Sequence, residues 1–122
     1  MINKHLHKWG YEVWIINTKK YCGKLLILRH GWKSSLHFHK KKDETFYIDN
    51  GTVYMETTNK AGNLVGKVMK IGESVRIRPN SPHRFRSISK LAKVIEFSTH
   101  HLESDSYRIE ESCKLGRHEQ FA

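Results

Sequence analysis

The chain has 122 residues, with 22 lysines and arginines against 12 acidic residues, which gives a net charge of +10. This length supports one hydrophobic core, so residues 1–122 are expected to form a single domain. The apolar runs are far shorter than the roughly 20 residues of a membrane span, so no membrane partner is expected. Residues 1–9 are polar and lack the apolar centre of a secretory signal.

The chain has two cysteines, Cys22 and Cys113, and nine histidines. Two cysteines so far apart form neither a disulfide framework nor a Cys-x-x-Cys site. They therefore indicate a cytoplasmic protein with free thiols. The positive charge suggests an anionic partner and the histidines suggest a metal, but neither total identifies one.

Side chains alternate with a period of two along most of the chain, and β-branched and aromatic residues dominate the alternating runs. The predicted strands cover residues 11–15, 23–29, 36–39, 44–48, 52–57, 74–78, 84–86 and 93–97. Short turns separate them, as in an all-β sandwich or barrel. The barrel core is expected over residues 11–99. No helix is expected before Ser98, and the tail, residues 100–122, is expected to hold a short helix or coil.

Four residues in the middle of the chain have the chemistry and spacing of metal ligands. His37 and His39 are two apart on a predicted strand, so both imidazoles lie on one face. Glu44 opens the next strand, and His83 follows a strand that ends in a tight turn. Three imidazoles and one carboxylate suit a divalent first-row metal: Mn, Fe, Co, Ni or Zn. We therefore predict a metal site formed by His37, His39, Glu44 and His83.

The spacing of this segment resembles the first cupin motif, in which a Gly, five residues, His-x-His, four residues, Glu and six residues precede a second Gly. The matching positions here are Gly31, His37, His39, Glu44 and Gly51. The resemblance implies a double-stranded β-helix, or jelly-roll barrel, with the ligands pointing inward. It also implies that a homodimer is common.

The segment from Gly72 to His83 is similar to the second cupin motif, with a departure in its turn. Asn80 stands where the family has a Gly, and Ser87 stands where it usually has an Asn. Asn tolerates the left-handed backbone conformation that the Gly would adopt, so the turn is expected to form.

The flanking segments resemble those of sugar-active cupins of the D-lyxose/mannose isomerase type and of the barrel domain of type II mannose-6-phosphate isomerases. The similar segments are residues 9–14, 21–26, 95–99, 105–110 and 116–117. The resemblance implies a metal-dependent sugar or sugar-phosphate isomerase or epimerase. In such an enzyme a divalent ion chelates and stabilises an enediolate.

An isomerase also needs a group that moves a proton between two carbons of the sugar. The candidates are Lys24, Glu44 and Glu96. The resemblance to the family's barrel lysine favours an inward Lys24, against the competing interpretation of an exposed edge lysine. Arg108 is a candidate for binding a sugar hydroxyl or phosphate, or else forms a surface salt bridge with Glu110 or Glu111.

Two other functions stay open: a metal-dependent cupin dioxygenase, which uses the same ligands, and a non-enzymatic sugar-binding cupin associated with carbohydrate biosynthesis. No nucleic-acid partner is expected, because the basic residues are scattered and no binding motif is present. The loop at residues 40–42 is interpreted as solvated, and His100 and His101 as an exposed pair. His5 and His7 are interpreted as non-ligands in a mobile N-terminus.

Overall fold

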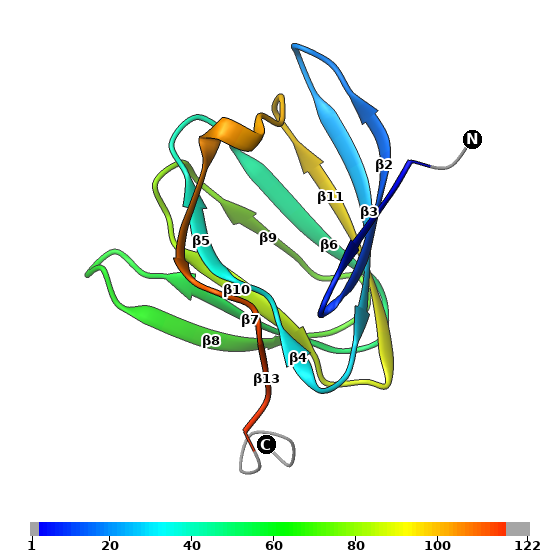
Figure 1. The fold of residues 1–122 in the computed structure, drawn as a ribbon. Coiled ribbons are helices and arrows are strands. Elements are labelled where there is room, and N and C mark those ends of the chain that lie inside the picture. The colour runs from blue at the N-terminus through cyan, green and yellow to red at the C-terminus, as the bar shows by residue number, and fades with distance from the viewer. Residues whose placement is uncertain (1–2, 117–122) are drawn as a thin grey trace.

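The structure, a computed structural model, describes residues 3–116 and consists of two antiparallel β-sheets that face each other (Figure 1). The first sheet has the strand order β1-β2-β3-β11-β6-β9. Its strands are β1 (Lys4–His7), β2 (Gly10–Asn17), β3 (Cys22–Arg29), β6 (Glu44–Asn50), β9 (Ser74–Ile77) and β11 (Leu91–Ser98). This arrangement confirms the predicted all-β jelly roll.

The second sheet has the path β12-β5-β10-β4-β13, and β7 joins it by pairing with β10 and β8. Its strands are β4 (Trp32–Lys33), β5 (Leu36–His39), β7 (Val53–Thr58), β8 (Leu64–Met69), β10 (His83–Ser87), β12 (Ser106–Glu110) and β13 (Cys113–Lys114). No helix of the described residues has the length and apolar character needed to cross a membrane.

The inner face of the first sheet is apolar at one end of the barrel and polar at the other. Leu26, Val94 and Ile48 lie in register across β3, β11 and β6, and each is at most 2% exposed. Burying an aliphatic side chain of this size contributes about 2 kcal/mol, so this end anchors the barrel. Two residues farther along β3 and β11, Lys24 lies opposite Glu96 in the strand register. The inner surface therefore changes there from apolar to charged.

The two unusual turn positions adopt the conformations that the motifs require. Asn80 has φ 67°, as predicted for the residue that replaces the motif's Gly, and its N–H donates to the carbonyl of His39 at 2.6 Å. Gly51 has φ 78°, and a Cβ there would lie 2.7 Å from the carbonyl oxygen of Leu91. Position 51 therefore excludes every side chain, because the Cβ would clash with backbone atoms that cannot move aside.

Two segments near the ends of the chain differ from the sequence-based expectation. The tail does contain a short 3₁₀ helix, Glu103–Asp105, but it then continues as the strands β12 and β13. Residues 4–7 form β1 on the edge of the first sheet, so the expectation of a mobile N-terminus was wrong for them. Alternation is too short in these edge strands to be recognised. Residues 117–122, including the Arg117 of the tail motif, lie outside the described residues.

Candidate functional site

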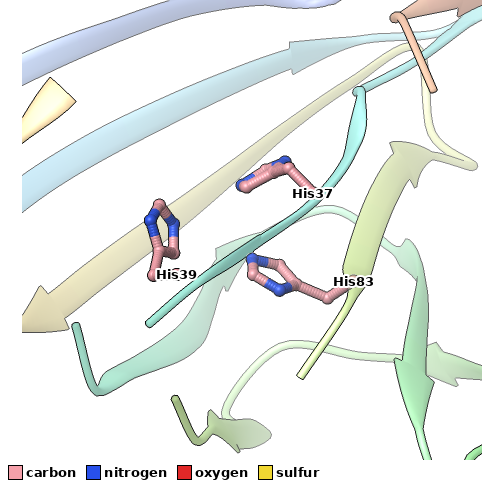
Figure 2. Close-up of side chains that lie close together, drawn as sticks. All are labelled: His37, His39 and His83. Atoms are coloured by element: carbon pink, nitrogen blue, oxygen red, sulfur yellow. The ribbon is translucent and has the colours of Figure 1, made fainter. Parts of the chain in front are cut away.

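Three imidazoles from the second sheet converge inside the barrel. His37 and His39 project from β5 and His83 from β10, and their rings approach one another in Figure 2. One ring nitrogen from each lies within 4.8 Å of the others. His37 and His83 are directly paired across β5 and β10, so sheet register brings them together although 46 positions separate them in the sequence.

Hydrogen bonds to backbone carbonyls orient all three rings. Nδ1 of His37 donates to the carbonyl of Ser35 at 3.0 Å, and Nδ1 of His83 donates to that of Ser81 at 2.9 Å. His39 Nδ1 donates to the carbonyl of Asp105 at 3.1 Å. A carbonyl oxygen only accepts, so each Nδ1 carries the proton and each Nε2 presents a lone pair, as metal-binding histidines do.

Glu44 supplies a carboxylate to this cluster from the opposite sheet. Its Oε2 lies 3.4 Å from His39 Nε2 and 3.2 Å from His83 Nε2. Glu44 is 2% exposed and His83 is fully buried, yet Glu44 Oε2 and His83 Nε2 form no hydrogen bond. Buried acceptors that face one another need a cation between them. The donor set therefore fits a divalent metal ion, held by His37, His39, His83 and Glu44.

The electrostatics of the cluster keep its members in metal-binding protonation states. Burial, followed by the nearby imidazoles of His83 and His39, lowers the pKa of His37 to about 3. Burial also lowers the pKa of His39. For Glu44, burial opposes ionisation, but His83, Lys42 and His39 outweigh it, so the net pKa is lowered. His37 and His39 are thus set to present neutral imidazoles beside an ionised Glu44.

The loop between the ligand strands β5 and β6 is held by one carboxylate. Asp105 is 5% exposed, and its two oxygens accept the backbone N–H groups of Lys40, Lys41 and Lys42 at 3.0 to 3.2 Å. Its own carbonyl is the acceptor for His39 Nδ1. Asp105 therefore fixes both the loop and one candidate ligand, His39. The sequence did not indicate this role for Asp105.

Lys42 corrects the expectation of a solvated loop at residues 40–42. It is 3% exposed, and its Nζ lies 2.6 Å from Glu96 Oε2 and 3.6 Å from Glu44 Oε1. It also donates to Nδ1 of His101 at 3.0 Å. The backbone bonds to Asp105 turn the loop inward at this residue, while Lys40 and Lys41 remain exposed.

Two further candidates from the sequence, Lys24 and Glu96 on the first sheet, lie inside the barrel. Lys24 is 1% exposed, and its Nζ lies 3.3 Å from Glu12 Oε1 and 4.2 Å from the centre of the Trp14 ring. Glu96 is 4% exposed and pairs with Lys42. Burial and the charge of Glu44 raise the pKa of Glu96 against the opposing effect of Lys42.

Glu12 is a cavity residue that the sequence did not single out. Its carboxylate contacts the imidazole of His7 and the ammonium of Lys24. Burial raises its pKa, but these two partners outweigh that effect and lower it to about 2. Gly10, Glu12 and Trp14 alternate with Tyr11 and Val13, so the alternation predicted the strand without saying which face is inside.

These groups line one cavity of about 140 Å³, which extends from the candidate metal ligands past Lys24, Glu12 and Glu96. His101, expected to be exposed, has a side chain only 10% exposed and lines this cavity. Burial, followed by the charges of Lys42 and Lys24, lowers its pKa to about 4. Arg108 also lines the cavity, but its side chain is 58% exposed and pairs with Glu111 at 3.0 Å.

No protein-family model matches the chain, and no curated protein matches its sequence. Solved structures match its fold. Oxalate decarboxylase from Bacillus subtilis superposes with a TM-score of 0.78 at 16% identity, covering 88% of this chain and 30% of that one. CapF, a capsular polysaccharide assembling protein from Staphylococcus aureus, gives 0.79 at 16% identity, covering 90% and 34%.

A third structure, the formate complex of Lactobacillus farciminis oxalate decarboxylase, gives a TM-score of 0.77 at 14% identity over 88% of this chain and 34% of that one. One structure of the Bacillus subtilis enzyme is described with Mn(II) centres. This chain spans about a third of the length of each of these solved chains. At these identities the likeness establishes the fold alone.

We predict that Asp105→Ala destabilises the protein by about 2 to 3 kcal/mol, because it leaves three N–H groups of the ligand loop, that of Lys42 buried, without their acceptor. Urea unfolding would measure this, and Mn²⁺ titration should show roughly tenfold or greater loss of affinity. Asp49→Ala is the matched control, since the Asp49 side chain is 42% exposed and makes only a 3.8 Å pair with Lys93. Equal stability of the two variants would contradict the assigned role.

We also predict a pH-dependent contribution from Glu12. Its pKa is lowered in the fold from 4.5 to about 2, so its stabilisation is present above pH 4.5 and is lost as the pH falls toward 2. At neutral pH, Glu12→Gln should lower the free energy of unfolding by an amount on the order of 3 kcal/mol. Urea unfolding between pH 7 and pH 3 should show this difference shrinking. Glu111→Gln, at a side chain 77% exposed, should show almost none, and a pH-independent difference for Glu12→Gln would contradict the assignment.

Proposed function

Since the chain has the cupin fold, as its solved structural neighbours do, we propose that it is a metal-dependent isomerase or epimerase of a small sugar or sugar phosphate. The observation that carries the proposal is a cavity lined by three of the four candidate metal ligands, His37, His39 and Glu44, together with buried proton-carrying groups. A divalent ion bound there would act as a Lewis acid on a substrate carbonyl and its neighbouring hydroxyl.

The charged residues supply what such a reaction needs besides the ion. Lys24 and Lys42 are both at most 3% exposed and carry ammonium groups into the cavity, where they can stabilise negative charge on a bound substrate. Their own charges are offset by Glu12, Glu44 and Glu96. The cavity thus holds ionisable groups without a large net charge.

Lys24 is the residue we assign to proton movement on the substrate. Its Nζ is held between Glu12 and the face of Trp14, which leaves it a fixed position at the cavity wall. Glu12 is a positioning residue in this assignment, since its carboxylate fixes the ammonium. Glu44 belongs to the ligand set, because its Oε2 faces the imidazoles, and Glu96 is already engaged by Lys42. Glu96 therefore acts through that lysine.

The size and surroundings of the cavity favour a small polar substrate. A volume of about 140 Å³ is close to that of an engineered cavity of roughly 150 Å³ that admits benzene. Arg108 lines the cavity with a side chain 58% exposed, where it could exchange Glu111 for a substrate phosphate or hydroxyl. The likeness to CapF, named for capsular polysaccharide assembly, supports a carbohydrate context.

The test is proton exchange on a panel of substrates. The full chain is stripped with EDTA, reloaded separately with Mn²⁺, Fe²⁺, Co²⁺, Ni²⁺ or Zn²⁺, and incubated in D₂O with aldoses, ketoses and their phosphates. Loss of the C2 proton signal of an aldose, or of a C1 proton signal of a ketose, by NMR is the expected result. His83→Ala should abolish both metal binding and exchange, while Lys24→Met should retain metal and lower exchange at least a hundredfold.

The matched control is His30→Ala, because His30 is exposed and bonds only the carbonyl of Ser87, so metal and exchange should persist. Metal binding without exchange on any sugar would overturn the isomerase. Oxygen consumption with a catechol or thiol would then identify a dioxygenase, which the three-His, one-Glu ligand set also permits. Sugar binding without turnover would identify a sugar-binding cupin.

We also propose a homodimer that buries the outer face of the first sheet. Val13, Leu25, Ile95 and Tyr47 lie in register across four strands on this face, and none is fully buried. Phe97 is 58% exposed beside them, and continuous apolar faces of this kind mark protein interfaces.

Light scattering tests this dimer: the molecular mass of the parent chain should be twice 14.4 kDa, and Phe97→Asp should halve that mass. Ile109→Asp is the control on the other sheet, at 53% exposure; a monomeric parent chain would contradict the proposal.

A further inference from the structure

A second pocket lies on the outer face of the second sheet, on the opposite side of β10 from the imidazole cluster. Its volume is about 380 Å³, and Lys33, Arg84 and Arg86 line it together with a single carboxylate, Glu56. Side chains alternate along a strand, so His83 and Phe85 point into the barrel while Arg84 and Arg86 point away from it.

The two arginines differ in how their charge is compensated. Arg84 is 6% exposed; its Nη2 donates to Glu110 at 2.6 Å, and its Nε lies 3.9 Å from Glu56. That Nε is buried and has no hydrogen-bond partner in the described part of the chain. The charge of Arg84 is therefore met, while one of its donors is left over.

Arg86 is only 8% exposed, and its charge is not met by any carboxylate within 4 Å among residues 3–116. Its guanidinium lies 4.8 Å from the centre of the Tyr54 ring, which is its cross-strand neighbour. On its other side Arg86 is paired in register with Lys33, a second cation. A buried cation without an anion is costly.

Backbone geometry keeps Tyr54 in place over this pocket. A Cβ at Gly66 would lie 1.8 Å from the Tyr54 hydroxyl oxygen, so the ring lies directly against the glycine on β8. The aromatic face and the guanidinium thus form one rigid wall, and β4, β10, β7 and β8 adjoin one another there (Figure 1). The pocket is pre-formed instead of depending on a flexible loop.

We infer that this outer arginine pocket, formed by Lys33, Arg84, Arg86 and Tyr54, binds a small oxyanion of the phosphate class. Arg86 brings a buried charge that no carboxylate of residues 3–116 meets, and an oxyanion in the pocket would compensate it. The planar guanidinium of Arg86 and the unused Nε of Arg84 supply donors suited to its oxygens. The site is separate from the barrel cavity and does not depend on the metal.

The experiment is a titration of the EDTA-treated full chain with inorganic phosphate, followed by calorimetry and by the shift in melting temperature. We expect saturable binding in the parent chain. Arg86→Met keeps the aliphatic stem against Tyr54 and removes the charge, so it should fold and weaken phosphate binding at least tenfold. Arg86→Lys should weaken binding less. In the absence of phosphate, the melting temperature of Arg86→Met should be no lower than that of the parent chain, because the charge that the substitution removes is uncompensated.

Two control variants assign the effect to this pocket. Arg76→Gln removes the same charge from a side chain 54% exposed on the other sheet and should leave phosphate binding unchanged. His83→Ala should also leave it unchanged. Equal phosphate affinity in Arg86→Met and the parent, or loss of binding in His83→Ala alone, would overturn the inference. So would a change of molecular mass in Arg86→Met without any phosphate effect, since the pocket would then hold a carboxylate of a second copy.

Discussion

The approach of Glu44 to the Nε2 atoms of His39 and His83 is the contact on which the interior of this barrel depends. It joins the two sheets, because the carboxylate comes from β6 and the imidazoles from β5 and β10. Every imidazole in the cluster is oriented by a backbone carbonyl at its Nδ1, so the lone pairs converge where the carboxylate lies. A cation at this point would satisfy all four groups and link the sheets.

The rest of the polar interior is arranged around that cluster as charge pairs. Lys42 lies between Glu44 and Glu96, and Lys24 lies beside Glu12. Removing one member of such a buried pair leaves the other charge uncompensated, which costs far more than the pair contributes. This network of buried charges occupies one end of the barrel, while the other end is apolar. Such a concentration of charged groups favours a functional role for the interior over a purely structural one.

The segment after the last long strand completes the site from outside the barrel core. Asp105 binds three consecutive N–H groups of the loop that carries Lys42, and its carbonyl orients His39. The same segment continues into β12, which pairs with β5 beside the ligand histidines. The tail is therefore part of the candidate site, and changes in it will act on the candidate ligands through backbone hydrogen bonds.

The sequence by itself determined the cupin fold, the four candidate ligands and the left-handed Asn80, because motif spacing and strand alternation are local properties of the chain. The tertiary structure alone decided which face of β2 is inside, so that Glu12 enters the cavity. It also decided that Lys42 is buried and that Arg86 lies on the outer face opposite Lys33. These features depend on sheet register and loop direction, which distant strands impose, and no pattern within a single strand encodes them.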